Sequence, residues 1–251
     1  MKRLLDITVA LIGLLLASPV LLPVMFLVWW QDRHSPFYIA PRVGRDDSIF
    51  RMVKLRSMRI NADKSGVDST SAADSRITSV GHFIRRYKLD EITQLWNVLR
   101  GDMSLVGPRP NVERETRLYT AVERELLSVR PGITDYASIV FADEGDILTG
   151  HPDPDLGYNQ LIRPWKSRLG LFYIRHSGIA LDLKLVALTA LAILSRERAL
   201  AAVSHDLQTR GAPADLVEIA RRRQQLVPWP PPGASEVVQS RDTAAAQMPA
   251  D

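Results

Sequence analysis

Two adjacent carboxylates, Asp90 and Glu91, lie where the residues able to do chemistry are most concentrated in the chain. Apolar residues follow the pair at helical spacing and end before a glycine, which predicts one helix with the pair in its first turn (Leu89, Ile92, Leu95, Trp96, Leu99, then Gly101). The free N–H groups at a helix start favour an ionised carboxylate and any phosphate bound nearby. Such a pair is also an ordinary helix cap, and spacing alone favours that simpler interpretation.

Arg109 lies between two prolines in the segment 106–110, Val-Gly-Pro-Arg-Pro. Because proline lacks an N–H donor, this segment cannot join the middle of a sheet, and we expect an extended conformation that displays Arg109. An arginine held in this way suits a phosphate, whose oxygens accept its forked donors two at a time. Taken alone, the segment is typical of a surface turn.

Residues 88–110, KLDEITQLWNVLRGDMSLVGPRP, resemble the signature block of the bacterial sugar transferases. These are monotopic phosphoglycosyl transferases, which load a sugar phosphate onto a polyprenyl phosphate. The resemblance is nearly gapless in the signature and extends more loosely from Lys2 to about Ser195. Its length makes chance a poor explanation and raises the weight of the chemical interpretation.

The resemblance implies a two-step transfer. The Asp90 carboxylate would attack the sugar-bearing phosphorus of a UDP-sugar and release UMP, and polyprenyl phosphate would then attack the phosphosugar-aspartyl intermediate. Mg²⁺, held by Asp90 and Glu91, would bridge carboxylate and diphosphate. Glu91 would bind the metal or handle a proton, and Arg109 would hold a phosphate.

Two alternating stretches between residues 36 and 58 flank a turn at residues 44–47 and predict a β-hairpin. With a period of two residues, Lys54 and Arg56 are expected on one face. Paired basic residues on a hairpin usually face solvent, and beside a membrane they can also touch lipid headgroups. The family has a similar K-x-R-S-M segment, which implies phosphate contact from Lys54 or Arg56.

Three arginines, Arg76, Arg85 and Arg86, precede the carboxylate pair. Arg76 belongs to the segment DSRIT at residues 74–78, which also resembles the family. A single arginine would mean little at this place. Several that converge on Asp90 are better explained by an anionic ligand than by solubility.

The stretch from Ile7 to Trp30 contains twenty-four residues and no charge. A straight helix of this length, at about 1.5 Å per residue, would cross a hydrocarbon core of about 30 Å. Pro19 and Pro23 each remove a helical hydrogen bond, and the Ser18 hydroxyl can satisfy a freed carbonyl, so we predict a break near the middle. Basic residues flank both ends, and both flanks stay in the cytoplasm only if the segment re-enters its own leaflet.

The residues alone leave a kinked spanning helix open, because transmembrane helices tolerate proline. A signal peptide is disfavoured by the length of the apolar run and by a poor cleavage site. The family has a re-entrant helix broken at a Ser-Pro pair, and Ser18-Pro19 matches it. The resemblance therefore implies a monotopic protein of the bacterial inner membrane, with its catalytic domain facing the cytoplasm.

The chain after Arg109 gives weaker signals. Residues 112–129 predict a charged amphipathic helix. Residues 135–165 depart from the segment usual in the family, so the sugar is not inferred. Within them, Asp153-Pro154-Asp155 is a D-x-D triplet, a pattern with which many glycosyltransferases hold a divalent ion, although chance produces it often. Residues 179–194 are too short to span and predict a core or membrane-surface helix.

The amino-acid composition excludes only a few classes of protein. The chain has 251 residues, 46% of them hydrophobic, and its net charge of +4 suits nucleic acid, anionic lipid or phosphorylated substrates equally. The absence of cysteine excludes disulfides and thiolate metal sites. No metal-binding histidine spacing and no glycine-rich phosphate loop is present, so zinc, dinucleotide and P-loop proteins lose support.

We predict an α+β fold that is predominantly helical with a small β-hairpin. Its three parts are a membrane helix-break-helix at 1–33, a cytosolic catalytic domain with interfacial helices at 34–205, and a short basic helix with a disordered tail at 206–251. The expected partners are a UDP-sugar, polyprenyl phosphate and the membrane, and not nucleic acid. Homo-oligomerisation stays open. So do two other functions: a D-x-D glycosyltransferase, which would release UDP, and a membrane-attached scaffold, which would release no nucleotide.

Overall fold

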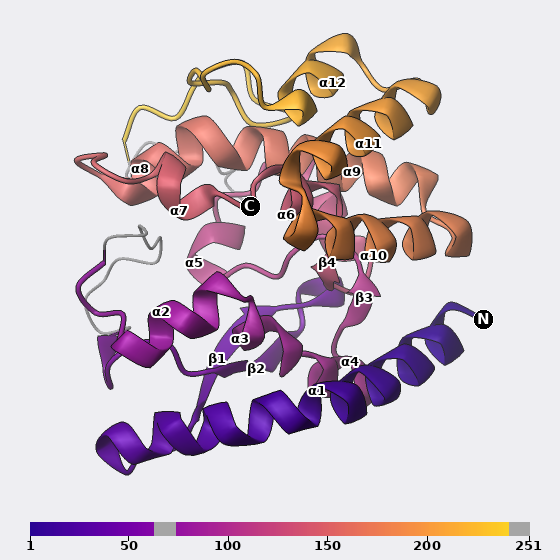
Figure 1. The fold of residues 1–251 in the computed structure, drawn as a ribbon. Coiled ribbons are helices and arrows are strands. Elements are labelled where there is room, and N and C mark those ends of the chain that lie inside the picture. Colours follow the sequence, from indigo (N-terminus) through magenta and orange to yellow (C-terminus); the bar gives the residue numbers. More distant parts are fainter. Residues whose placement is uncertain (63–73, 241–251) are drawn as a thin grey trace.

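The computed structural model describes residues 1–62 and 74–240, and Figure 1 shows their arrangement. The first half of the chain forms α1 (Lys2–Asp32), β1 (Phe37–Val43), the 3-10 turn η1 (Arg45–Asp47), β2 (Ile49–Leu55), α2 (Ser79–Arg86), α3 (Leu89–Ile92), α4 (Leu95–Arg100) and β3 (Ser104–Val106). The second half forms α5 (Glu113–Thr116), the 3-10 turn η3 (Glu123–Ser128), β4 (Gly132–Thr134), α6 (Tyr136–Val140), α7 (Glu144–Ile147), α8 (Pro154–Gly157), the π-helical turn η4 (Tyr158–Ile162), α9 (Arg163–His176), α10 (Ile179–Leu194), α11 (Arg196–Thr209) and α12 (Ala214–Arg221). The predicted, mainly helical α+β class is confirmed.

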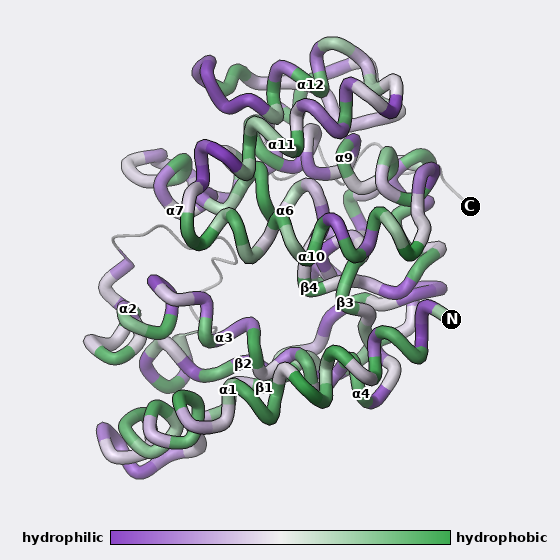
Figure 2. Tube along the Cα trace, turned by 45° about the vertical axis from the view of Figure 1, so that its right-hand side comes forward, coloured by the Kyte–Doolittle hydropathy of each residue, from purple (hydrophilic) through white to green (hydrophobic). Residues whose placement is uncertain are grey.

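The long helix α1 lies along the base of the molecule in Figure 1, and Figure 2 shows its predominantly hydrophobic composition. It continues through Pro19 and Pro23, so the interruption predicted within residues 1–33 is absent from this helix. The Ser18 hydroxyl donates to the Leu15 carbonyl at 2.7 Å, as predicted for a helix that proline disturbs. Among the described residues, α1 is the one helix long and apolar enough to cross a membrane.

One face of α1 packs against the rest of the protein along nearly its whole length. Its buried residues recur at helical spacing (Asp6, Ala10, Leu21, Val24 and Val28). The opposite face exposes large apolar side chains, among them Leu4, Leu11, Leu15, Leu16, Leu22, Phe26 and Trp30. The helix therefore lies on the domain with an apolar stripe turned outwards.

Polar contacts tie both ends of α1 to the same domain. Near the start, Lys2 pairs with Asp182 of α10 at 2.7 Å. One turn later, Asp6 accepts hydrogen bonds from the Ser104 hydroxyl and the Leu105 N–H of β3, each at 3.1 Å. Asp32, the last residue of α1, pairs with Arg56, which follows β2. These contacts fix the helix against the domain at its two extremes.

The predicted hairpin is confirmed. β1 and β2 pair antiparallel from Phe37 opposite Leu55 to Val43 opposite Ile49, with η1 as the turn. A second, parallel pair, β3 with β4, was not predicted, since each strand has only three residues. The two small sheets and the short helices α2, α3 and α4 lie between α1 and the larger helices (Figure 1).

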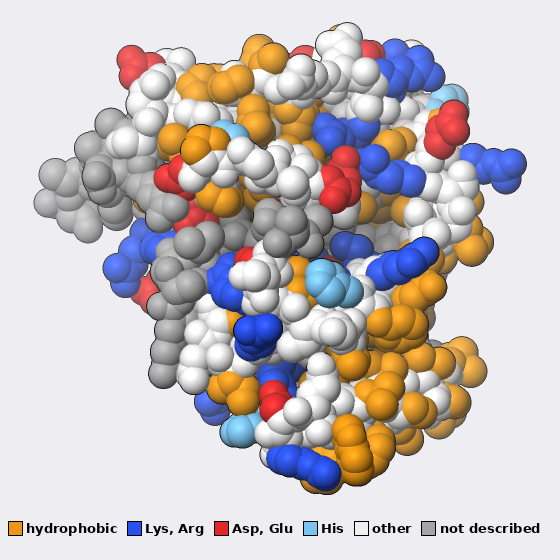
Figure 3. Space-filling model, turned by 60° about the vertical axis from the view of Figure 1, so that its left-hand side comes forward, with side chains coloured by type: hydrophobic (Ala, Val, Ile, Leu, Met, Phe, Trp, Pro, Cys, Tyr) orange, Lys and Arg blue, Asp and Glu red, His pale blue; other side chains and the backbone are white. Residues whose placement is uncertain are grey.

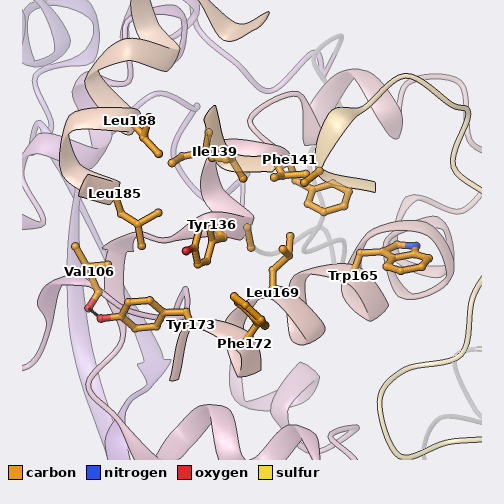
Figure 4. Close-up of a cluster of buried hydrophobic side chains, with 14 of the residues drawn as sticks. Val106, Tyr136, Ile139, Phe141, Trp165, Leu169, Phe172, Tyr173, Leu185 and Leu188 are labelled. Carbon is orange, nitrogen blue, oxygen red and sulfur yellow. Dashed lines mark hydrogen bonds between the residues drawn. The ribbon is translucent and has the colours of Figure 1, made fainter. Parts of the chain in front are cut away.

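The main hydrophobic core lies where α6, α9 and α10 meet (Figure 4). Tyr136, Leu169 and Leu185 are fully enclosed there, and the Tyr173 hydroxyl donates to the Val106 carbonyl at 3.2 Å. The prediction of a helix over residues 179–194 is confirmed as α10. A smaller cluster lies where α1 meets β2, α2 and α3 (Leu21, Val24, Val28, Leu55, Ile84 and Leu89). This cluster and the polar contacts at its ends hold the hairpin on α1.

Three predictions for the second half of the chain are wrong. Residues 112–129 form only the short α5 and η3, and the boundary drawn between 205 and 206 falls inside α11. Residues 227–240, predicted as disordered, lie against the domain, because Trp229 contacts Trp165 at 5.2 Å between ring centroids and Gln160 donates to the Val238 carbonyl at 2.7 Å. The remainder of the predicted disordered tail, 241–251, lies outside the described residues.

Candidate active site

Asp90 and Glu91 lie in α3, a helix of one turn, and not in the single helix predicted from residue 89 to residue 100. Lys88, with a φ of 55°, separates α3 from α2, and a turn at residues 93 and 94 separates it from α4. The predicted end at Gly101 is confirmed, with a φ of 94°. A single turn carries little macrodipole, so the charged groups nearby matter more to the carboxylates than the helix does.

Side chains that follow the carboxylates attach α3 and α4 to the hairpin. The Thr93 hydroxyl donates to the Val53 carbonyl at 3.2 Å. Asn97, fully buried, accepts from the Val53 N–H at 2.8 Å and donates to the Arg51 carbonyl at 2.7 Å. These bonds bring β2 alongside α3 and thereby place Lys54 opposite Asp90.

Two cation–carboxylate pairs form the centre of the site. The Lys54 ammonium lies 3.8 Å from the Asp90 carboxylate, and Arg109 contacts the Glu91 carboxylate at 2.9 Å. The Lys54 and Asp90 side chains are 21% and 15% exposed, and those of Arg109 and Glu91 are 32% and 22% exposed. All four therefore line a partly enclosed surface that a solute can still reach.

The pairs perturb each other's ionisation. Burial, helped by Arg109, lowers the pKa of Lys54 to about 8 against the opposing effect of Asp90 and Glu91. Burial alone would raise the pKa of Glu91. The positive charges of Arg109 and Lys54 have the larger combined effect, so the pKa of Glu91 lies below its ordinary value. Glu91 in turn raises the pKa of Arg109. Near neutral pH the Glu91 carboxylate is thus charged and lies beside two cations, Arg109 and Lys54.

A close backbone crossing fixes Arg109. The Gly107 N–H donates to the Thr134 carbonyl and the Gly132 N–H donates to the Pro108 carbonyl, both at 3.0 Å. A Cβ atom on Gly132 would lie 2.1 Å from the Gly107 nitrogen, so only glycine permits this approach. The prolines around Arg109 lie beyond the end of β3, in agreement with the sequence.

The other predicted basic residues divide into two groups. Arg85 is close enough to Asp90 for this carboxylate to oppose the lowering of its pKa by burial, and its Nε donates to the Ser57 hydroxyl at 3.0 Å. Arg76 is held by Asp74 at 2.6 Å and Arg56 by Asp32. Arg85 thus joins Lys54 and Arg109 near the carboxylates, whereas Arg56 and Arg76 have carboxylate partners of their own. Lys54 and Arg56, predicted on one face of the hairpin, thus contact different carboxylates, and phosphate contact from either residue stays a prediction.

Comparison with known proteins adds an independent observation to this geometry. The family model described as bacterial sugar transferase matches residues 1–196 of the chain, which include every residue of the site. The chain belongs to the bacterial sugar transferase family. The expectation raised by the signature residues is therefore confirmed.

Three relatives of this bacterial sugar transferase show how its similarity is distributed. A protein of Bacillus subtilis named as a putative undecaprenyl-phosphate N-acetylgalactosaminyl 1-phosphate transferase is 46% identical over 43% of this chain and 61% of its own. The undecaprenyl-phosphate glucose phosphotransferase of Komagataeibacter xylinus is 37% identical over 75% of this chain and 35% of its own. An Aeromonas hydrophila protein named as a UDP-N-acetylgalactosamine-undecaprenyl-phosphate N-acetylgalactosaminephosphotransferase is 34% identical over 68% of this chain and 42% of its own. The chain thus spans between about a third and two thirds of the length of these relatives.

Two residues of this sugar transferase that the sequence did not single out also face the site. Glu144, at the start of α7, forms an ion pair with Lys166 of α9, and its charge contributes to the raised pKa of Arg109. Burial opposes ionisation of Glu144, but Lys166 and Arg109 keep its pKa below the ordinary value. Lys166 lines the same hollow as Arg109, together with Asn111, Tyr119, Asp135, Ser138 and Tyr158. No sequence motif marks Glu144 or Lys166. Glu144 lies in the segment that departs from the family pattern.

The site fits Mg²⁺ only when the ion is shared with a ligand. Among residues 1–62 and 74–240, no group of three or more histidine, cysteine or acidic side chains could hold a metal ion. Asp90 and Glu91 supply two partly exposed carboxylates on one turn, and Mg²⁺ commonly takes one or two carboxylates from a protein and the remaining oxygens from substrate phosphates and water. The carboxylates thus fit one side of such a site.

The D-x-D triplet has a structural explanation. The Asp153 side chain caps α8 by accepting from the N–H groups of Asp155 and Leu156, each at 3.1 Å. Asp155 is buried and pairs with Arg114 at 3.3 Å. Both carboxylates are used within the fold, so the geometry gives no support to the glycosyltransferase alternative.

Proposed function

We propose that this protein transfers a sugar 1-phosphate from a UDP-sugar to polyprenyl phosphate and releases UMP. The observation that carries the proposal is the set of alternating charges formed by Lys54, Asp90, Glu91 and Arg109. Both substrates are anions, so a productive site must neutralise charge and position phosphorus. The names of the relatives, which include undecaprenyl-phosphate sugar phosphotransferases, support the same reaction.

Asp90 is the proposed nucleophile. Its oxygen attacks the sugar-bearing phosphorus of the UDP-sugar, a P–O bond forms to the carboxylate, and the bridging P–O bond breaks so that UMP leaves with the bridging oxygen. A phosphate oxygen of the polyprenyl phosphate then attacks the same phosphorus and regenerates the free carboxylate. At 3.8 Å the Lys54 ammonium orients Asp90 without a close hydrogen bond, which leaves the carboxylate oxygens available to react.

The neighbouring groups have binding roles in this proposal. Arg109, with its guanidinium oriented by Glu91, binds a phosphate of the diphosphate group, and Arg85 lies near enough to Asp90 to receive a second. Asp90 and Glu91 would hold Mg²⁺, which when bound neutralises the diphosphate and stabilises UMP as a leaving group. Glu91 also keeps Arg109 directed into the site.

We further propose that α1 lies in one leaflet of the inner membrane without crossing it, with the active site facing the cytoplasm. Polar contacts tie Lys2, Asp6 and Asp32 to one domain, whereas a spanning helix would place its ends on opposite sides of the bilayer. The continuous exposed apolar stripe suits a helix that enters lipid by one face. Tags placed before Lys2 and after Ser195 should report the same side, and opposite sides would contradict this topology.

A panel of UDP-sugars with polyprenyl phosphate, read out by the nucleotide released, tests the reaction. Release of UMP together with a polyprenyl-diphospho-sugar is expected. Release of UDP would indicate a glycosyltransferase, and release of no nucleotide would indicate a scaffold. A donor labelled in its sugar-proximal phosphate should leave label on the protein, and lipid product without labelled protein would exclude the covalent route.

A further inference from the structure

The C-terminal end of α1 carries a cluster of aromatic rings with one guanidinium against it. The ring of Phe26 lies 5.8 Å from Trp29 and 5.6 Å from Trp30, between centroids. The Arg33 guanidinium lies 4.4 Å from the Trp29 ring and 4.2 Å from the Trp30 ring. Arg33 has a φ of 59°, and its N–H donates to the Trp29 carbonyl at 2.7 Å, so the turn that ends the helix directs it back over the indoles.

This cluster is exposed, although its residues are among the largest apolar side chains of the protein. Phe26 is 54% exposed, Trp29 37% and Trp30 57%. Arg33 is exposed as well, and within the described part of the chain it forms no ion pair, because the carboxylate of the preceding residue is taken by Arg56. The outer donors of the guanidinium are therefore available to an anion.

We propose that Phe26, Trp29, Trp30 and Arg33 form an anchor that binds the phosphate of a membrane phospholipid. Indole rings prefer the boundary between hydrocarbon and headgroups, because one part of the ring is apolar and its N–H is polar. A guanidinium stacked on aromatic rings keeps its forked donors free for a phosphate. The ligand of the anchor is thus a lipid phosphodiester at the headgroup level.

The surroundings of the anchor favour lipid over a protein partner. The cluster continues the exposed apolar stripe of α1, which includes Leu15, Leu22 and Leu27, and does not form an isolated patch. Figure 3 shows this apolar surface at the bottom of the molecule, with basic side chains beside it. A bilayer matches both features at once, since hydrocarbon covers the stripe and headgroup phosphates meet the cation.

The anchor is connected to the active site through few residues. Asp32 accepts from Arg56 at 2.7 Å, and Arg56, only 9% exposed, also donates to the Ser35 carbonyl at 2.9 Å. Two residues before Arg56 on the same chain segment, Lys54 faces Asp90. We infer that the anchor sets the height of Asp90 relative to the lipid phosphates, an inference that rests on the proposed function.

The depth of the anchor can be measured directly. Because the chain has no cysteine, Gln31→Cys at an exposed position beside the anchor gives a unique site for a nitroxide label. In bilayers of phosphatidylglycerol and phosphatidylcholine, the label of the full-length protein is expected at headgroup depth. Arg33→Gln and Trp30→Ala should each move the label outwards by about 5 Å. Arg33→Lys should move it by less, because lysine keeps the positive charge but lacks the forked donors of arginine.

Arg198→Gln is the matched control, because it removes one exposed positive charge from α11, on the side of the molecule away from α1 (Figure 1). It should not move the label. An unchanged depth in both Arg33→Gln and Trp30→Ala would overturn the anchor, as would a label at the bilayer centre or in water. Inorganic phosphate, added to the protein in detergent, distinguishes a free phosphate from a lipid headgroup as the ligand. If inorganic phosphate binds the anchor and the depth of the label does not depend on lipid, the proposal is also overturned.

Turnover gives a second readout that separates the two proposals. In bilayers Arg33→Gln should raise the KM for polyprenyl phosphate about fivefold, with a smaller rise in detergent, where no bilayer surface fixes the height of the site. Equal rises in both media would contradict the link between anchor and active site. If the unsubstituted protein releases no UMP from any donor, the proposed function fails, but the depth measurement still decides the anchor.

Discussion

Two basic residues at the end of the hairpin, Lys54 and Arg56, each face a carboxylate, yet the two pairs differ in almost every physical respect. Arg56 contacts Asp32 through two donors, one of them at 2.7 Å, and donates as well to the carbonyls of Val28 and Ser35. Lys54 stands 3.8 Å from Asp90. The Arg56 side chain is 9% exposed and that of Lys54 is 21% exposed.

The difference separates a pair that holds the fold from a pair that remains available for a ligand. A forked, multiply bonded arginine fixes the end of α1 against the hairpin, because several bonds would have to break together. A lysine without a close hydrogen bond leaves both carboxylate oxygens of Asp90 accessible while still supplying positive charge. We expect substitutions in the first pair to change stability and those in the second to change turnover.

The largest effect is expected for Asp90→Asn. Loss of the proposed nucleophile should lower UMP release on the order of 10⁴-fold, while the protein stays folded and membrane-bound. Asp32→Asn is the matched control, since it makes the same chemical change in the structural pair and should retain most turnover per folded molecule. Comparable UMP release by Asp90→Asn and the unsubstituted protein would remove Asp90 from its proposed role.

Arg56→Met tests the other pair. Removal of the buried guanidinium breaks its hydrogen bonds to Asp32 and to the Ser35 carbonyl and should lower the free energy of unfolding by about 2 kcal/mol, measured by denaturant titration in detergent. The hydrogen bond from Arg56 lowers the pKa of Asp32 to about 2. Its stabilising effect is therefore present above the unfolded value of 3.8 and is lost as pH falls towards 2.

The matched control is Lys54→Met, which should cost less than about 1 kcal/mol because no close hydrogen bond is broken. If both substitutions destabilise the protein equally, the distinction between the two pairs is wrong. If Arg56→Met, and not Lys54→Met, removes the loss of stability seen as pH falls from 3.8 towards 2, the distinction between the two pairs is supported.

The same comparison shows what the sequence could predict. Alternation and turn residues located the hairpin, and the signature located Asp90, Glu91 and Arg109. Alternation predicted a shared face for Lys54 and Arg56 but could not predict that they contact different carboxylates, Asp90 and Asp32. Asp32, the partner of Arg56, comes from another element, and sequence spacing carries no information about that contact.

Tertiary contacts explain the other errors. Apolar spacing predicted one helix from residue 89 to residue 100, but a turn at residues 93 and 94, where the Thr93 hydroxyl bonds to β2, separates α3 from α4. Glu144 reaches the site through a contact with Lys166, twenty-two positions later in the chain. Proline-rich composition predicted disorder after residue 226, but Trp229 has an aromatic surface to lie against. Each outcome depends on a distant partner.

The titration of Lys54 gives a further test of the pair formed by Lys54 and Asp90. Lys54 is charged below its pKa of about 8 and loses its charge above it. Since this charge neutralises an anionic site, kcat/KM for UMP release should fall about tenfold as pH rises through that value. Lys54→Arg keeps the charge, and its profile should fall at higher pH. A profile identical in the two proteins would assign the titration to another group.

The smallest effect is expected for Glu144→Gln. Glu144 does not contact Arg109 through a hydrogen bond in the described structure, but its charge adds to that of Glu91 in stabilising the Arg109 cation, and it holds Lys166 by an ion pair. Loss of the charge should free Lys166 and shift Arg109 slightly, so that the KM for the UDP-sugar changes about threefold while kcat stays near its original value.

Asp143→Asn is the control, because Asp143 precedes Glu144 but pairs with Arg196 and Arg222 on the side of the C-terminal helices. It should change stability and leave the KM nearly constant. A fall in kcat with an unchanged KM in Glu144→Gln would mean that Glu144 acts on the reacting phosphorus. In that case the reactive charges would extend beyond the two central pairs, and the contrast between Lys54 and Arg56 would describe only part of the site.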